Sequence, residues 1–150
     1  MLQMITDLLR VNRLEKQADS WILTSAVTGS WVTPTASGVG RPTKGNWAMP
    51  IFTESKRDGS AGFTGDVSVT KGVTVLYGNM EARTDQFVGT PAIGDKLYVT
   101  ADGKLGNAAG AAVTPDGEAA IHAVARCTKA PHTVEWFGND ALSVIEFVTI

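Results

Sequence analysis

The chain has 150 residues, a net charge of −2 and a charged fraction of only 19%. This length fits one domain of common size, and the charge lacks the basic footprint of a nucleic-acid-binding protein. Cys127 is the only cysteine, which excludes an internal disulfide and indicates a small buried hydrophobe in a fold completed in a reducing cytoplasm. No stretch approaches the roughly 18 apolar residues of a membrane span, and residues 1–10 lack the pattern of a secretory signal, so we expect a soluble protein.

Charge is spread unevenly along the chain. Residues 1–57 contain seven Lys or Arg and four Asp or Glu, a balance of +3, whereas residues 58–150 contain six and eleven, a balance of −5. Small asymmetries of this kind are common on solvated surfaces. An ordinary surface and a basic partner-binding segment are both consistent with it.

The first element expected is an N-terminal arm over residues 1–20. Polar residues crowd the segment, but its apolar residues fall roughly at helical spacing: Met4, Ile5, Leu8, Val11 and Leu14. A short helix and an extended arm both fit this pattern. Such an arm would add a strand to a neighbouring protein or place its apolar residues in a groove.

Residues 21–150 are expected to form a single β-rich domain. Trp21–Val27 is rich in β-forming residues and runs into Thr28-Gly29-Ser30, which predicts a strand that ends in a turn. In residues 31–57 the prolines and glycines are too closely spaced for a long helix or a central strand. This stretch predicts a long loop or a set of edge-strand fragments.

Two hairpins are predicted in the middle of the chain. In the first, Asp66–Thr70 alternates, Lys71-Gly72 supplies the turn and Val73–Tyr77 is the partner strand. In the second, Asp95–Leu105 contains Asp102-Gly103, which tolerates the positive φ angles of a type I′ turn.

The rest of the second half is expected to be mostly strand. Asn107–Glu118 is rich in Ala and Gly and predicts a flexible connection. Ala119–Cys127 alternates and places four side chains on one face: Ile121, Ala123, Ala125 and Cys127. Val134–Phe137 and Leu142–Val148 predict two more strands. Short strands without long amphipathic helices predict a mainly β fold, a small antiparallel β-sandwich or barrel with an N-terminal arm and a long Pro/Gly-rich loop.

The nucleotide and calcium motifs are incomplete. Gly40–Asn46 has the glycine spacing of a phosphate-binding loop, but Asn46 stands where the lysine is required. The glycines at 38 and 40 open a dinucleotide fingerprint that fails at Thr43. Asp58 and Asp66 lack the further carboxylates of a calcium loop. We therefore expect no cofactor and no metal site in these stretches.

The histidines and the cysteine do not form a catalytic pattern. His122 and His132 are the only histidines, and with one cysteine they cannot build a closed zinc site. Cys127 lies five residues from each of them, which on a strand places it on the opposite face. We expect no catalytic residues, and not an enzyme.

The four tryptophans fall into two pairs. Trp21 and Trp136 lie in strand-like runs, where burial in the core is the usual role. Trp31 and Trp47 bracket the Pro/Gly-rich stretch, where large aromatics can anchor a partner surface. For this second pair, a partner interface and local packing are weighed equally.

Three stretches carry a recognisable pattern: Pro50–Ser60, Val73–Gly78 with Thr84–Phe87, and above all Gly94–Leu105. They look like the decoration, or cement, proteins of tailed bacteriophages, and the likeness covers about residues 45–130. The resemblance implies a β-rich protein without catalytic residues that assembles as a small homo-oligomer, often a trimer, where capsid subunits meet.

The resemblance also implies partners and a location. The partners would be the major capsid protein and further copies of the chain, as a trimer or a dimer, with no nucleic acid or membrane partner. The chain would be made in the host bacterial cytoplasm and sit on the capsid exterior of the virion, where contacts with several subunits stabilise the shell. Candidate capsid or subunit contacts are Leu8, Arg10, Val11, Arg13, Leu14, Trp31, Arg41 and Trp47.

A carbohydrate-binding or adhesin module of a phage tail or fibre is the alternative, because tryptophans in loops on a β scaffold can serve as sugar platforms. Loss of glycan binding in Trp31→Ala and Trp47→Ala variants would favour it, whereas sedimentation with capsids would favour the decoration protein. A small hydrolase is the weakest interpretation, since no nucleophile, base and orienting group can be assembled from these motifs.

Overall fold

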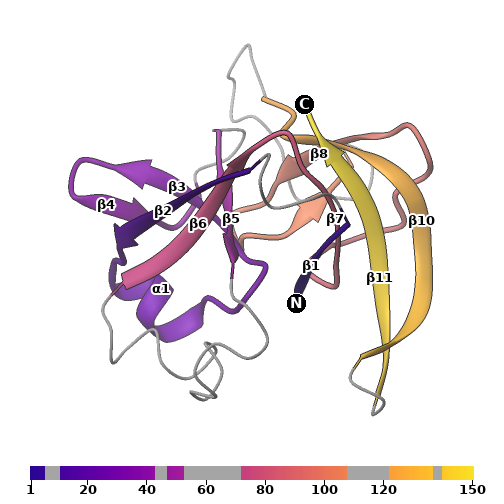
Figure 1. Ribbon diagram of the computed structural model, residues 1–150, viewed down its shortest axis with the longest axis horizontal. Coiled ribbons are helices and arrows are strands. Elements are labelled where there is room, and N and C mark those ends of the chain that lie inside the picture. The colour runs from indigo at the N-terminus through magenta and orange to yellow at the C-terminus, as the bar shows by residue number, and fades with distance from the viewer. Residues whose placement is uncertain (6–10, 43–46, 53–71, 108–121, 137–139) are drawn as a thin grey trace.

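The computed structural model describes residues 1–5, 11–42, 47–52, 72–107, 122–136 and 140–150. These residues form strands in two antiparallel sheets and one short helix (Figure 1), and the predicted mainly β fold is confirmed. The elements are β1 Leu2–Met4, β2 Val11–Gln17, α1 Ser20–Ser25, β3 Trp31–Thr35, β4 Gly38–Gly40, β5 Met49–Phe52, β6 Gly72–Gly78, β7 Glu81–Thr84, β8 Lys96–Val99, β9 Leu105–Gly106, β10 Ala125–Trp136 and β11 Asp140–Thr149.

The two sheets divide the chain into three consecutive parts. One sheet has the strand order β1-β7-β11-β10-β8-β9, and the other has the order β2-β6-β5-β3-β4. The chain starts in the six-stranded sheet with β1, builds the five-stranded sheet with β2 to β6, and returns for β7 to β11. The two ends of the chain therefore belong to the same sheet.

The middle of the five-stranded sheet, formed by β5, β6 and the start of β3, is buried on both faces. One face packs against the six-stranded sheet, where the rings of Trp31 and Phe147 have centroids 5.8 Å apart at an angle of 59°. The other face packs against α1, with Val32 and Ile22 in a second core. The neighbours Trp31 and Val32 thus enter different cores.

The five-stranded sheet also curls until its two edge strands approach each other. Ala18, just after β2, forms a bridge with Val39 in β4, and the Asp19 N–H donates to the Val39 carbonyl at 3.2 Å. A Cβ atom on Gly38 would meet the carbonyl oxygen of Gln17. The glycine that opens an incomplete nucleotide fingerprint is therefore required by the close approach of two strands.

The strand predicted over Trp21–Val27 is wrong, because the chain forms α1 there. The Asp19 side chain caps the helix by accepting a hydrogen bond from the Ile22 N–H at 3.0 Å. Burial of Ile22 outweighs the β propensity of the segment. The predicted turn after it is confirmed, with the Ser30 N–H donating to the Val27 carbonyl at 2.9 Å. No helix in the described ranges has the length and hydropathy needed to cross a membrane.

The hairpin predicted over Asp95–Leu105 is confirmed as β8 and β9, with Val99 opposite Leu105. Its turn differs from the expected type I′ form. The Gly103 N–H donates to the Thr100 carbonyl at 3.0 Å, and Gly103 has a φ of +73°. This is the pattern of a three-residue loop that ends in a left-handed glycine.

Most of the described residues of the arm expected over residues 1–20 lie in the sheets, as β1 and β2. β1 pairs with β7, and β2 pairs with β6 along its whole length, from Val11 opposite Gly78 to Gln17 opposite Gly72. Leu2 and Val11 are buried in the core between the sheets. These apolar contacts explain why the segment folds onto its own chain.

The Pro/Gly-rich stretch expected as a long loop or edge fragments forms β3, β4 and β5. β4 is an edge strand, but β3 and β5 lie inside the sheet. Each proline stands where its missing N–H is tolerated. Pro34 on β3 is exposed. Pro50 precedes the β5–β6 pairing, which begins at Ile51.

The remaining strand predictions have mixed outcomes. Val73–Tyr77 lies in β6, whose partners are β2 and β5, while its predicted hairpin partner Asp66–Thr70 lies outside the described residues. Of the strand expected over Ala119–Cys127, residues 119–121 lie outside the described residues, and β10 contains the part from Ala125, with Ala125 and Cys127 buried. The described part of the strand expected over Val134–Phe137 lies in β10, and Leu142–Val148 lies in β11. Of the connection expected over Asn107–Glu118, only Asn107 lies within the described residues.

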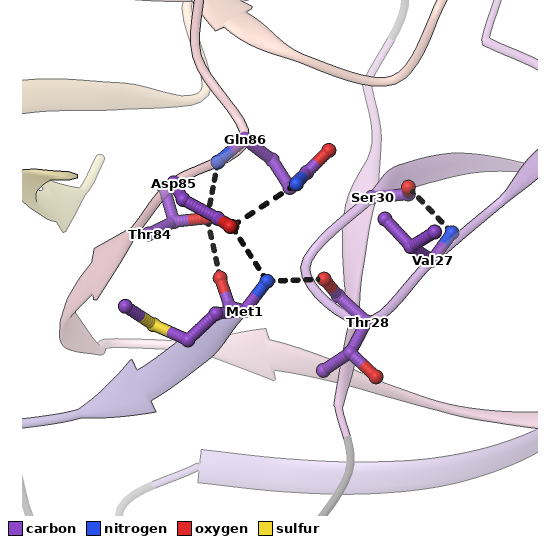
Figure 2. A network of polar contacts seen from close by, with 7 residues as sticks. All are labelled: Met1, Val27, Thr28, Ser30, Thr84, Asp85 and Gln86. Carbon is purple, nitrogen blue, oxygen red and sulfur yellow. Dashed lines mark hydrogen bonds and ion pairs between the residues drawn. The ribbon is translucent and has the colours of Figure 1, made fainter. Parts of the chain in front are cut away.

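A polar network holds β1 and β7 against the turn that precedes β3 (Figure 2). The Met1 amino group donates to the Thr28 carbonyl at 2.8 Å and to Asp85 Oδ1 at 2.6 Å. The Thr84 hydroxyl donates to the Met1 carbonyl at 2.7 Å. Gln86 donates to the same Asp85 oxygen at 3.0 Å. The network therefore connects the six-stranded sheet to the start of the five-stranded sheet.

Candidate functional site

The eight candidate contact residues occupy very different environments. Leu8 and Arg10 lie outside the described residues, and Val11 is buried between the sheets. Leu14 packs against the core around α1. The remaining four are Arg13, Trp31, Arg41 and Trp47, of which only Trp31 is buried. The structure therefore does not bring the six described residues together as one surface.

Trp31 and Trp47, predicted as a pair, have different roles. Trp31 is a core residue with 1% of its surface exposed, whereas Trp47 is 53% exposed. The Thr33 hydroxyl donates to the Trp47 carbonyl at 2.8 Å, which fixes the backbone that carries the exposed ring. Of this pair, only Trp47 is available to a partner.

A cleft of about 240 Å³ lies next to these two tryptophans. Its wall combines the start of β3 and β5 with the end of β6 and the end of β11, and includes Trp31, Trp47, Tyr77, Asn79 and Ile150. It opens where the two sheets meet. The sequence prediction found the two tryptophans of this site but not the residues from β6 and β11, because nothing local indicates that those segments converge.

Arg41 is held within the chain. Its Nε donates to the Ala101 carbonyl at 2.7 Å, and its Nη2 donates to Asp102 Oδ1 at 2.8 Å. The guanidinium carbon also lies 5.8 Å from the centroid of the Trp21 ring. Arg41 thus connects the end of β4 to the β8–β9 turn, which is a structural role.

The long strands β10 and β11 extend beyond the strands that flank them. β8 and the turn before it reach β10 only as far as Cys127, and β7 pairs with β11 only from Ile145 to Val148. Residues 128–136 and 140–144 pair only with each other among the described strands, and we call them the outer ribbon. Figure 1 shows it extending past β1 and β7 on one side of the molecule.

The two edges of the outer ribbon differ. The β10 edge contains Lys129 and Pro131, and its register shifts between Cys127 and Lys129 and again between Lys129 and His132. Lysines, prolines and bulges are the features that protect an edge strand from pairing with another chain. The β11 edge over residues 140–144 has no proline, lysine or register shift. Among the described residues it is therefore the less protected edge.

His132 has a structural environment on the ribbon. Its Nδ1 lies 2.9 Å from the Ala130 carbonyl, and its Nε2 lies 3.2 Å from Glu146 Oε2, within ion-pair distance but without the alignment of a hydrogen bond. Lys129 Nζ lies 3.7 Å from the same oxygen. These groups connect β10 to β11 where the register shifts interrupt their pairing. His122 is exposed.

Cys127 is the small buried hydrophobe that the sequence predicts. Its side chain is 1% exposed, and its thiol donates to the Lys129 carbonyl at 3.4 Å. Burial raises the pKa of the Cys127 thiol, with a smaller contribution from the negative charge of Asp95. The thiol is therefore held in its protonated, unreactive form.

No group of three or more His, Cys, Asp or Glu side chains in the described ranges could hold a metal ion. Asp58 and Asp66, the two carboxylates weighed as a metal site, lie outside those ranges.

No protein-family model, curated protein or solved structure matches this chain.

Proposed function

We propose that this chain is a structural decoration protein that binds the outer surface of a tailed-phage capsid as a small homo-oligomer. Its motifs over Pro50–Ser60, Val73–Gly78 with Thr84–Phe87, and Gly94–Leu105 resemble those proteins. The strands β8 and β9, which carry the strongest of these motifs, lie at one edge of the six-stranded sheet. The proposal assigns the chain no chemistry, only attachment.

The observation that carries the proposal is the outer ribbon with its less protected β11 edge. A two-stranded ribbon is marginally stable in water, and gains stability when a further strand or surface covers it. The backbone groups of residues 140–144 that point away from β10 can pair with an extended segment of a partner. Leu142, half-buried beside them, adds apolar contact.

Several copies acting together would give the attachment its strength. When one oligomer touches several shell subunits, each contact raises the effective concentration for the next. A protein that binds only the assembled shell also stabilises that shell relative to its open states by mass action. This explains how a small ribbon contact can support a large assembly.

We place the proposed contact on the ribbon and not on residues 1–20. β1 and β2 are paired within the sheets, so the deletion of residues 1–18 would remove two strands of the fold. Loss of shell binding in that deletion would therefore report unfolding. The ribbon offers a cleaner test because its outer part extends beyond both cores.

The test uses two lysine substitutions that face each other across the ribbon. Ser143 on β11 lies opposite Thr133 on β10, and both side chains are exposed. Purified protein is sedimented with capsids prepared without it. Ser143→Lys is expected to weaken binding roughly tenfold or more, because a lysine hinders pairing at an open edge.

The matched control is Thr133→Lys, which adds the same charge to the same face but to the strand whose edge is already protected. It is expected to bind like the wild type. Equal loss in both variants would show that a face of the ribbon, and not its β11 edge, makes the contact. Wild-type protein that stays monomeric and does not sediment with any capsid would contradict the proposed function.

A further inference from the structure

The cleft beside Trp47 has a wall of uncharged side chains. It is built from both sheets, and among the described residues that line it none carries an Asp, Glu, Lys, Arg or His side chain. Charged ligands such as phosphates, carboxylates or amines are usually held by side chains of opposite charge. The lining therefore fits an electrically neutral ligand.

Trp47 supplies an aromatic face at the mouth of this cleft. The ring is 53% exposed, although its backbone is held by the Thr33 hydroxyl at 2.8 Å. An exposed aromatic on a held backbone loses less entropy when it packs against a ligand than one on a free loop. The flat C–H face of a sugar ring is a surface that such a ring can cover.

The cleft also contains a group that can serve hydroxyls. Asn79, exposed at the turn between β6 and β7, has an amide that both donates and accepts. The Trp31 indole N–H is buried and so is not open to a ligand in the cleft. Among the described lining residues, Asn79 is therefore the group that we assign to ligand hydroxyls.

The wall is held in position before any ligand arrives. The Thr149 hydroxyl donates to the Gly78 carbonyl at 2.7 Å and accepts from the Met80 N–H at 2.9 Å, which fixes the turn that carries Asn79. The Ile150 N–H donates to the Val124 carbonyl at 3.2 Å. A site whose walls are already fixed binds with a smaller ordering cost.

We propose that this cleft binds one ring of a neutral saccharide, with Trp47 as the platform and Asn79 as a hydrogen-bonding group. The volume of about 240 Å³ lies below the roughly 300–1,000 Å³ of sites for drug-sized ligands, which fits a single ring. The inference goes beyond the proposed function, because attachment through the ribbon needs no small ligand. It would let a capsid-bound protein also contact glycans outside the particle.

The experiment is calorimetric titration of the full chain with neutral sugars: methyl glucoside, methyl galactoside and N-acetylglucosamine. Glucuronic acid and glucosamine serve as charged counterparts of similar shape. At least one neutral sugar is expected to bind in the millimolar range, and more tightly than its charged counterpart. Trp47→Ala is expected to weaken that binding about tenfold.

Two further variants make the result decisive. Ile93→Ala removes a side chain that is 72% exposed and lies outside the cleft, and is expected to bind like the wild type. Asn79→Ala removes the amide without touching either core and is expected to weaken binding. Each variant is first shown to be folded by circular dichroism, and Asn79→Ala tests the site if Trp47→Ala fails to fold.

Three results would overturn the proposal. They are the absence of binding by every neutral sugar, equal binding by the charged counterparts, and wild-type affinity in both Trp47→Ala and Asn79→Ala. Heat released only by a neutral peptide with an aromatic residue would also overturn it, by assigning the cleft to a protein partner. Capsid sedimentation of Trp47→Ala is measured in parallel and is expected to be unchanged, so the two proposals fail separately.

Discussion

The edge strands of the two sheets differ in how they are paired. The five-stranded sheet curls until Ala18 beside β2 forms a bridge with Val39 in β4, and its middle strands are buried on both faces. The six-stranded sheet extends two long strands past their neighbours and leaves the β11 edge over residues 140–144 without a partner among the described strands. The edges of the first sheet thus meet at one point, while the long strands of the second extend away from their neighbours.

This difference separates stability from binding within one small chain. Burial of apolar side chains on two faces stabilises the curled sheet and leaves little surface for a partner. The outer ribbon contributes less to the core but offers an edge of backbone donors and acceptors. The predictions below test whether the two regions are as distinct as this comparison requires.

The largest effect is expected where the two sheets meet. Trp31→Ala removes the ring that packs against Phe147 and leaves a cavity between the sheets, so we expect the free energy of unfolding to fall by about 3–5 kcal/mol. The measurement is chemical denaturation followed by circular dichroism. Trp47→Ala is the matched control, and as a surface change it is expected to alter the free energy by no more than about 0.5 kcal/mol. Similar losses in both variants would contradict the separation of the two tryptophans.

A smaller effect is expected where the five-stranded sheet closes. In Gly38→Ala the new methyl group meets the Gln17 carbonyl oxygen and pushes β4 away from β2, which we expect to cost about 1–3 kcal/mol. Hydrogen exchange should become faster at the Asp19 amide, which bonds to Val39 there. The exposed neighbour Ser37→Ala should leave both measurements unchanged. Unaltered exchange at Asp19 in Gly38→Ala would show that the closing contact is not important for stability.

The link between the sheets near Met1 should matter less than either core. Asp85→Asn removes the charge that accepts a hydrogen bond from the Met1 amino group at 2.6 Å, and we expect a loss of about 1 kcal/mol, measured by thermal or chemical unfolding. Asp102→Asn is the control, because it also removes an ion pair, the one with Arg41. The Asp102 side chain in that pair is 74% exposed. An exposed pair of this kind is expected to contribute about 0–1 kcal/mol. A larger loss in the control than in Asp85→Asn would reverse the expected ranking.

The smallest effect concerns Asp95 in the turn before β8. A hydrogen bond from the Asn107 side chain at 2.7 Å, and a second from the Ala92 N–H, hold the pKa of the Asp95 carboxyl below its ordinary value of 3.8. Because the folded pKa is lowered, the stabilisation is present above the ordinary value and is lost as the pH falls through the folded value.

An NMR titration of the Asp95 carboxyl group checks this prediction. In Asn107→Ala its pKa should rise towards 3.8, while Ile93→Ala, a change in the same turn, should leave it where it is. An unchanged pKa in Asn107→Ala would mean that the hydrogen bond from Asn107 is not its cause.

Local sequence patterns were sufficient for several local features of the structure. The β8–β9 hairpin follows from two short strands around Asp102-Gly103, and the turn at Thr28–Ser30 follows from its glycine. Burial of Cys127 follows from alternation along a strand. In each case the signal and the structure lie within about a dozen residues of one another.

The prediction failed where a local preference competed with distant contacts. Trp21–Val27 contains β-forming residues, but the Asp19 cap and the buried Ile22 make it helical. Pro50 argues against an interior strand, yet β5 lies inside its sheet because its pairing with β6 begins at Ile51. Neither outcome can be derived without the neighbours of these segments.

The candidate surfaces show the same limit. The sequence predicted that Trp47 could meet a partner, but not that Asn79 and Ile150 lie near it. It predicted strands in the region of β10 and β11, but not that they exceed their neighbours, since that depends on where β7 and β8 end.

The sequence by itself determined that this chain is built from short antiparallel strands, because side-chain alternation and turn residues act over a few positions. Only the tertiary structure decided which strands are neighbours, which sheet closes and which edge stays open. Backbone donors and acceptors are the same in every strand, so the choice of partner depends on which pairing buries the apolar faces of segments far apart in the chain.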